Sequence, residues 1–195
     1  EGRGADAAAY AQQLRERYPG SADIEVLIGD VALLSGDPAA ALQSYRSAGE
    51  VRKTAALAER MAAAQHLLGR SREVEETFAH YLAEYPAERS VAARLGRLAA
   101  AQGNWQAAAA LLGHASRLAG GRNDPHLLAD LAQAQLEAGD PAAALANARE
   151  AYRLQRASPR ATSALAAALQ ASGEGGDVLL AKARRMAGEP ALALR

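Results

Sequence analysis

The chain contains no cysteine, and only 4% of its residues are aromatic. The absence of cysteine excludes disulfide bonds, thiolate catalysis and metal sites with cysteine ligands. A protein without thiols does not respond to the redox state of its surroundings. The sequence is therefore equally compatible with the cytoplasm and the periplasm.

The chain also lacks an excess of either charge and any long hydrophobic run. It has 22 basic and 22 acidic residues, so we expect no nucleic-acid partner, since such proteins usually present a basic surface. No apolar stretch reaches membrane-spanning length, and no signal-peptide core is present. The sequence begins at Glu1, inside a predicted helix that has no partner helix before it. We therefore expect a fragment of a longer polypeptide, whose targeting information can lie outside this piece.

Hydrophobic residues make up 50% of the chain, and alanine dominates among them. Alanine has the highest helix propensity and allows helices to approach closely. No alternating run of β-branched residues reaches strand length. The composition therefore predicts an all-α fold.

One heptapeptide, Gly-Asp-Pro-Ala-Ala-Ala-Leu, occurs twice, at Gly36–Leu42 and at Gly139–Leu145. A glycine that follows an apolar-periodic run ends a helix. Aspartate followed by proline begins one, with aspartate as the N-cap and proline at the first helical position. The heptapeptide therefore predicts a tight turn between two antiparallel helices, and its copies lie 103 residues apart.

Turn glycines recur along the whole chain with spacings of 33, 34, 36 and 34 residues, at Gly36, Gly69, Gly103, Gly139 and Gly173. This period predicts an orphan helix at 5–17 followed by five helix pairs in one domain, 1–195. The repeats are expected at about 22–54, 55–88, 89–124, 125–158 and 159–190. The first pair is expected at 23–35 and 38–51, and the last helix at 177–187.

Small residues recur where the two helices of each pair must cross, at Gly29, Ala62, Gly96, Ala132 and Ala166. With the period near 34, this pattern resembles the tetratricopeptide repeat family over essentially the whole chain. Two departures are the absence of tryptophan at the fourth repeat position and a proline near the repeat end only at Pro86 and Pro190. The resemblance implies a right-handed superhelical solenoid of antiparallel helix pairs, with about five repeats. Another helical-hairpin solenoid of similar period is the alternative.

The resemblance further implies that the first helix of each pair lines a concave groove that binds a partner peptide or helix. The family's groove positions are transferred to this sequence as Asp23, Val26, Asp30, Leu33, Glu59, His66, Arg97, His126, Gln133, Arg160 and Gln170. Such a groove would run from acidic and apolar to basic and amide-rich. The alternative interpretation of each residue is a solvated helix face.

Several sites that the family or an enzyme would need are missing. Co-chaperone members bind a C-terminal carboxylate through lysine and asparagine, but the corresponding positions here hold Val26, Asp30, Arg60, Ser90 and Arg94. The four histidines do not form a metalloprotease pair, and the glycines at 173–176 lack the Lys-Ser/Thr of a phosphate loop. We therefore predict no enzyme activity, no cofactor and no metal. Trp105 opens a helix and is interpreted as packing over a turn, with an exposed partner contact as the alternative.

The predicted function is a non-catalytic scaffold for protein–protein interaction, with a protein or peptide as partner. Alanine- and arginine-rich bacterial arrays of this kind often belong to envelope, secretion or exopolysaccharide-export assemblies, so the resemblance favours that setting. An alternative is a substrate-docking repeat domain of a larger enzyme, such as a glycosyl- or sulfotransferase. A third hypothesis is a homo-oligomer that forms through the terminal helices.

Overall fold

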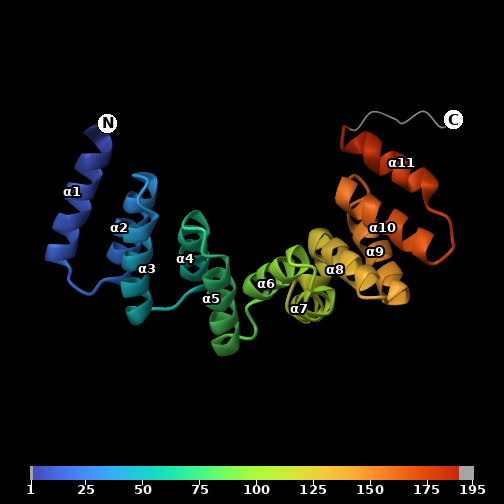
Figure 1. Cartoon of the computed structure of the whole chain (residues 1–195), viewed down its shortest axis with the longest axis horizontal. Helices are drawn as coiled ribbons and strands as arrows, with labels where there is room; N and C mark the ends of the chain where they lie inside the picture. The colour runs from blue at the N-terminus through green and yellow to red at the C-terminus, as the bar shows by residue number, and fades with distance from the viewer. Residues whose placement is uncertain (1, 189–195) are drawn as a thin grey trace. The chain divides into compact units, whose positions relative to one another are not determined.

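The computed structural model describes residues 2–188, and the side chains of residues 6–188. Within this part of the chain all regular structure is helical, and no strand is present. Successive helices form antiparallel hairpins (Figure 1), which confirms the predicted all-α fold of antiparallel helix pairs. The elements are α1 (Gly2–Arg17), α2 (Ala22–Leu34), α3 (Pro38–Val51), α4 (Ala55–Leu67), α5 (Ser71–Glu84), α6 (Arg89–Ala101), α7 (Trp105–Arg117), a short 3-10 helix (Gly121–Asn123), α8 (Pro125–Glu137), α9 (Pro141–Leu154), α10 (Pro159–Ala171) and α11 (Asp177–Met186).

The helices fall into two compact units, which we call unit 1 (Glu1–Tyr85, helices α1–α5) and unit 2 (Pro86–Arg195, helices α6–α11). The division lies beside the predicted border between the second and third repeats. Unit 1 thus holds the orphan helix and two helix pairs, and unit 2 holds three pairs. The single continuous domain over residues 1–195 stays a prediction.

The helix boundaries follow the turn signals closely. Helix α3 spans the predicted residues, α2 begins and ends one residue early, and α11 ends one residue early. The predicted start of the first helix was wrong, because α1 begins at Gly2 and not at residue 5. Glycine disfavours a helix by only about 1 kcal/mol, so Gly2 and Gly4 do not prevent the first turn of α1 from forming. The expected end of the fifth repeat, with Pro190, lies outside the described residues.

The five turn glycines share one backbone conformation, with φ between 72° and 87°. Residues other than glycine rarely adopt this left-handed backbone conformation, which ends a helix. The five glycines therefore end the first helix of each pair. Three of the turns continue into a side-chain N-cap. Asp37, Asn104 and Asp140 each accept a hydrogen bond from the backbone N–H three residues later, at 2.9, 3.3 and 3.0 Å. The turn chemistry that the sequence predicts is thus repeated in both units.

Close contact between the helices of a pair depends on the small residues at the crossing points. A Cβ added at Gly29 would lie 2.4 Å from Cε1 of Tyr45, whose ring is fully buried between α2 and α3. At the same repeat position, a Cβ on Gly96 would lie 2.8 Å from Cγ of the buried Leu112. Small residues therefore let a large side chain of the second helix pack directly on the backbone of the first.

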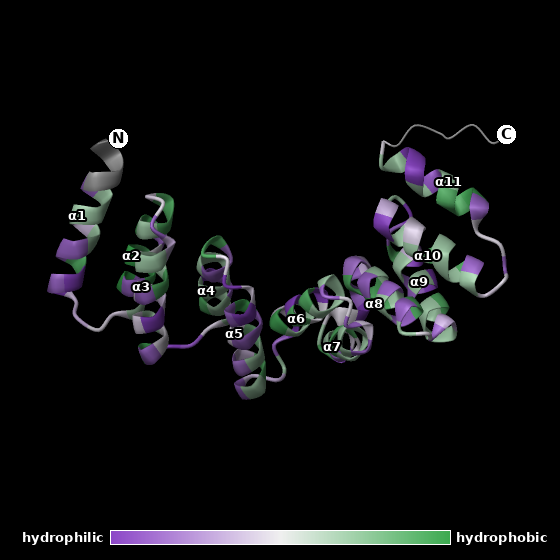
Figure 2. Ribbon diagram, in the orientation of Figure 1, coloured by the Kyte–Doolittle hydropathy of each residue, from purple (hydrophilic) through white to green (hydrophobic). Residues whose placement is uncertain are grey.

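Alanine supplies much of both cores. In unit 1, Ala41, Ala48 and Ala64 are fully buried around Leu42 and Tyr45. In unit 2 a comparable core joins α8, α9 and α10, and Leu179 of α11 packs against it. Most helices carry both hydrophobic and hydrophilic stretches (Figure 2), and α11 changes from hydrophobic near its start to hydrophilic near its end. This amphipathic pattern buries the apolar face of the helices in the core and leaves the polar face in solvent.

Candidate functional site

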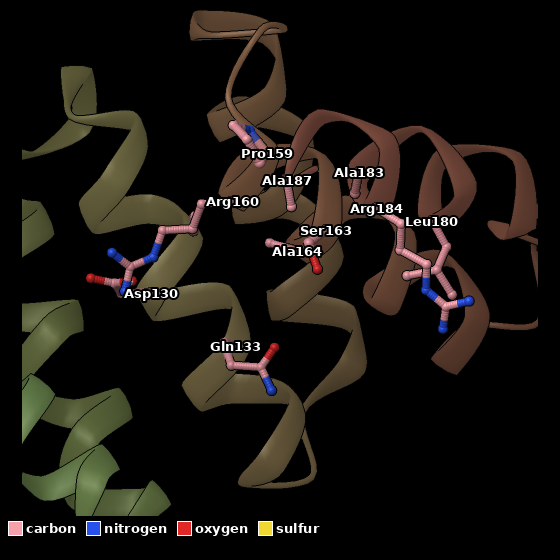
Figure 3. A pocket seen from close by; sticks show the side chains of 11 residues that line it. Asp130, Gln133, Pro159, Arg160, Ser163, Ala164, Leu180, Ala183, Arg184 and Ala187 are labelled. Atoms are coloured by element: carbon pink, nitrogen blue, oxygen red, sulfur yellow. The ribbon is translucent and has the colours of Figure 1, made fainter. Parts of the chain in front are cut away.

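A pocket of about 520 Å³ lies in unit 2 among α8, α10 and α11. Helices α8 and α10 are each the first helix of a pair, and they pack against each other. Figure 3 shows side chains of all three helices around this pocket. The lining residues are Ala129, Asp130, Gln133, Pro159, Arg160, Ser163, Ala164, Leu180, Ala183, Arg184 and Ala187.

Asp130 is the polar centre of one side of this pocket. Its side chain is only 6% exposed, and it accepts a hydrogen bond of 2.6 Å at Oδ2 from Nε of Arg97 on α6. Its other oxygen forms an ion pair with Arg160 on α10. In Figure 3, Arg160 reaches across to Asp130. One buried carboxylate thus connects the first helices of three successive pairs and fixes the position of Arg160 at the pocket.

Unit 1 has a related contact between the first helices of its two pairs. Asp30 of α2 accepts a hydrogen bond of 2.9 Å from Nε of Arg60 on α4, and a second of 2.7 Å from the hydroxyl of Tyr45. The hydrogen bond to Asp30 is also the main cause that raises the pKa of the Arg60 guanidinium. Burial, and then the hydrogen bond to Asp30, raise the pKa of the Tyr45 phenol. The phenol therefore stays protonated and serves as a donor.

The two contacts occupy the same pair of repeat positions with opposite charge. In unit 1 the acid is at the ninth position of one repeat and the base at the sixth of the next, Asp30 and Arg60. In unit 2 the base comes first, Arg97, and the acid second, Asp130. Adjacent first helices are thus connected by the same geometry in both units, with the sign of the charges exchanged.

The predicted groove residues of unit 1 take several roles in the structure. Val26 and Leu33 are half-buried and pack against the core. The exposed Asp23 forms an ion pair with Arg52, which follows α3. The others lie on α2 and α4 with at least part of their surface in solvent: Asp30, Glu59 and His66. Their role in partner binding stays a prediction.

Of the predicted residues in unit 2, Gln133 and Arg160 line the pocket, and Arg97 contacts it through Asp130. His126 and Gln170 are exposed and lie outside it. His126 is in the first turn of α8, where its backbone N–H donates to Asp124 at 3.0 Å, and the Gln170 amide donates to Asp177 at 2.8 Å. The structure therefore brings together three of the five.

The sequence reasoning missed Asp130 and all the pocket residues of α11. Asp130 was detectable, because its charge is opposite to that of Arg97 at the corresponding position of the preceding repeat, as with Asp30 and Arg60. The residues of α11 were not detectable from the repeat pattern. Leu180 and Arg184 lie on the last predicted helix, 177–187, and face the pocket (Figure 3).

A second cavity, of about 350 Å³, lies in unit 1 among α3, α4 and α5. Its inner surface includes the buried side chains of Leu57 and Ala58. Gly49 lines it at a position thirteen residues after the turn glycine, where other repeats hold Leu82, Ser116 and Tyr152. A Cβ on Gly49 would meet only Leu57 Cδ2, at 3.6 Å, so the missing side chain leaves open space.

Two other classes of site are absent from the described residues. Within 2–188, no three histidine, aspartate or glutamate side chains gather in a way that could hold a metal ion. Across the same residues, no helix is both long and apolar enough to cross a membrane. Trp105 at the start of α7 is half-buried.

Comparison with known proteins finds similarity in structure alone. No protein-family model matches the chain, and no curated protein matches its sequence. MamA (residues 41 to the end) from Desulfovibrio magneticus RS-1 superposes with a TM-score of 0.70 at 16% identity, covering 86% of this chain and 95% of that one. The C-terminal part of a TPR repeat-containing protein from Cytophaga hutchinsonii gives 0.69 at 13% identity, covering 94% and 71%. YrrB, described as a TPR protein with an unusual peptide-binding site, gives 0.73 at 16% identity, covering 92% and 93%.

Proposed function

We propose that this chain, which has the tetratricopeptide repeat fold, is a non-catalytic scaffold that holds a segment of a partner protein. The observation that carries the proposal is the pocket among α8, α10 and α11. Its 520 Å³ lie within the range of about 300–1,000 Å³ that is common for ligand sites. Its floor is formed by small apolar side chains, and Gln133, Arg160 and Ser163 supply a few polar groups. This combination suits a peptide whose side chains are small.

The same lining argues for binding rather than catalysis. Ser163 provides the hydroxyl among the lining residues, and no histidine or lysine lines the pocket beside it to act as a base. Arginine does not lose its proton in proteins, so Arg160 and Arg184 do not serve as bases. The Asp130 carboxylate is engaged by two guanidinium groups. These groups can position a ligand but do not activate a nucleophile.

The comparison with YrrB supports a peptide as the ligand, because that protein of the same fold is described as having a peptide-binding site. For the setting, we propose a bacterial envelope, secretion or exopolysaccharide-export assembly, which rests only on the resemblance to alanine- and arginine-rich bacterial repeat arrays. The scaffold would hold one component of such an assembly without changing it chemically.

Site-specific photocrosslinking tests the proposal. A benzophenone amino acid replaces Ser163, which is exposed at the pocket, in the protein expressed in its source cell. The matched control carries the same group at the exposed Ala146 on α9, outside the pocket. We expect one discrete crosslinked partner from Ser163 and none from Ala146. Equal labelling from both positions, or no protein adduct from Ser163, would overturn the proposal.

A further inference from the structure

The pocket of unit 2 carries more positive than negative charge. Arg160 and Arg184 line it, and Arg97 lies behind Asp130, which is the one acidic residue in the lining. Asp130 forms ion pairs with both Arg97 and Arg160, so it has no free charge left to repel an anion. With Arg184 included, three guanidinium groups and one carboxylate give an excess of two positive charges at this pocket. Such a surface favours an anionic ligand.

Arg184 differs from the two other arginines in its surroundings. Among the side chains of residues 6–188, it has neither a hydrogen-bonding partner nor an ion-pair partner. It lies on α11, while Arg160 comes from α10, and the two are on opposite sides of the pocket in Figure 3. A guanidinium that faces a pocket without a partner can bind one carboxylate through two parallel hydrogen bonds.

The rest of the lining restricts what can accompany that carboxylate. The pocket surface includes three small apolar side chains, those of Ala129, Ala164 and Ala183. Leu180 lies next to Arg184. Small apolar side chains fit this floor, and the lining holds no aromatic side chain on which a nucleobase could stack. Since α8 and α10 pack side by side, a segment that follows them passes over the floor and continues toward α6.

We propose that the pocket among α8, α10 and α11 recognises an aspartate or glutamate side chain within an extended partner segment, flanked by small apolar residues. Arg184 binds the carboxylate, and Arg160, fixed by Asp130, contributes positive potential from the opposite side. The acid is internal to the segment, because the face formed by the first helices continues past the pocket. This inference rests on the proposed function and names its ligand class.

Selection from a phage-displayed library of random segments tests it. Each segment has about ten residues, which span roughly 33 Å when extended, and continues into a linker at both ends. The bait is the 195-residue protein. Arg184→Gln is the test variant. Arg185→Gln is the matched control, since Arg185 is the exposed neighbour on α11, lies outside the pocket and loses the same charge.

We expect clones rich in aspartate or glutamate between small apolar residues on the wild-type protein and on Arg185→Gln. A synthetic, C-terminally amidated copy of a selected segment should bind Arg184→Gln about tenfold or more weakly in fluorescence polarisation. Replacing its acid by the corresponding amide should cause a similar loss for the wild type and little further loss for Arg184→Gln. Circular dichroism checks that each variant keeps its helical content.

The other outcomes separate the two proposals. Enriched clones without an acidic residue, or equal effects of the two arginine variants, overturn the ligand class and leave peptide binding intact. Binding that needs a free C-terminal carboxylate overturns the internal side chain. If no segment is enriched on the wild-type protein, the proposed function fails together with this inference.

Discussion

The close contact between Gly29 and Tyr45 gives the sharpest stability prediction. In Gly29→Ala, the new methyl group would lie 2.4 Å from Cε1 and 2.6 Å from Cδ1 of a fully buried ring. The ring cannot turn away freely, because its hydroxyl donates a hydrogen bond of 2.7 Å to Asp30, which also binds Arg60. The substitution must therefore strain the contact between α2 and α3 and also break this hydrogen bond.

The magnitude follows from three contributions. Overpacking costs about 1–3 kcal/mol, and loss of a hydrogen bond to a charged group costs about 1.5–3 kcal/mol. The higher helix propensity of alanine returns about 1 kcal/mol. We therefore expect Gly29→Ala to lower the free energy of unfolding by about 1.5–5 kcal/mol. For a chain of this size the melting temperature should fall by roughly 3–20 °C.

Gly49→Ala is the matched control, since it makes the same change inside the neighbouring helix α3. Its methyl group meets only Leu57, at an ordinary 3.6 Å, so we expect a gain of about 0.5–1 kcal/mol. Urea unfolding followed by circular dichroism measures both variants, while the fluorescence of the only tryptophan, Trp105, follows unit 2. Stability changes of the same sign in the two variants would refute the packing argument.

Three further predictions concern single side chains. Asp130→Asn should lower the free energy of unfolding by about 1–3 kcal/mol in urea titrations, because two guanidinium groups lose their buried counter-charge; an unchanged midpoint would contradict the role of Asp130 as the connecting acid. Arg70→Asp should stabilise the protein by about 0.5–1 kcal/mol in thermal melts, because Arg70, the residue before α5, provides no side-chain cap, unlike Asp37, Asn104 and Asp140; a lower melting temperature would speak against the cap. Above a pH of about 10, the unfolded phenol of Tyr45 ionises while the folded one, with its raised pKa, stays protonated, so stability should fall as the pH rises. Tyr45→Phe should flatten that part of the pH dependence of unfolding, and an identical slope in both proteins would refute it.

The fold could be predicted because its signals are local. A left-handed glycine marks each turn, an N-capping residue follows it in three of the five, as at Gly36 and Asp37, and small residues such as Gly29 mark where helices cross. These features depend on neighbours in sequence or on one repeat length. They therefore do not require knowledge of how distant helices meet.

The candidate site was harder to predict because its parts come from three repeats. Arg97, Asp130 and Arg160 meet at one carboxylate, although each lies on a different helix. A groove prediction made one repeat at a time finds the two arginines but not the acid between them. Arg184 was missed for another reason: the repeat pattern is lost after Gly173, so the sequence does not specify which face of α11 turns toward α10.

The exchanged signs of the two inter-repeat ion pairs limit how repeats of this protein can be recombined. Placing the fourth repeat directly after the first would set Asp30 opposite Asp130, and placing the second after the third would set Arg97 opposite Arg60. Either arrangement replaces an attraction by the repulsion of like charges. The helical pairs are therefore not interchangeable modules. An array with its repeats in another order would keep the turn glycines and the small residues at helix crossings, but its adjacent repeats would lose their complementary charges.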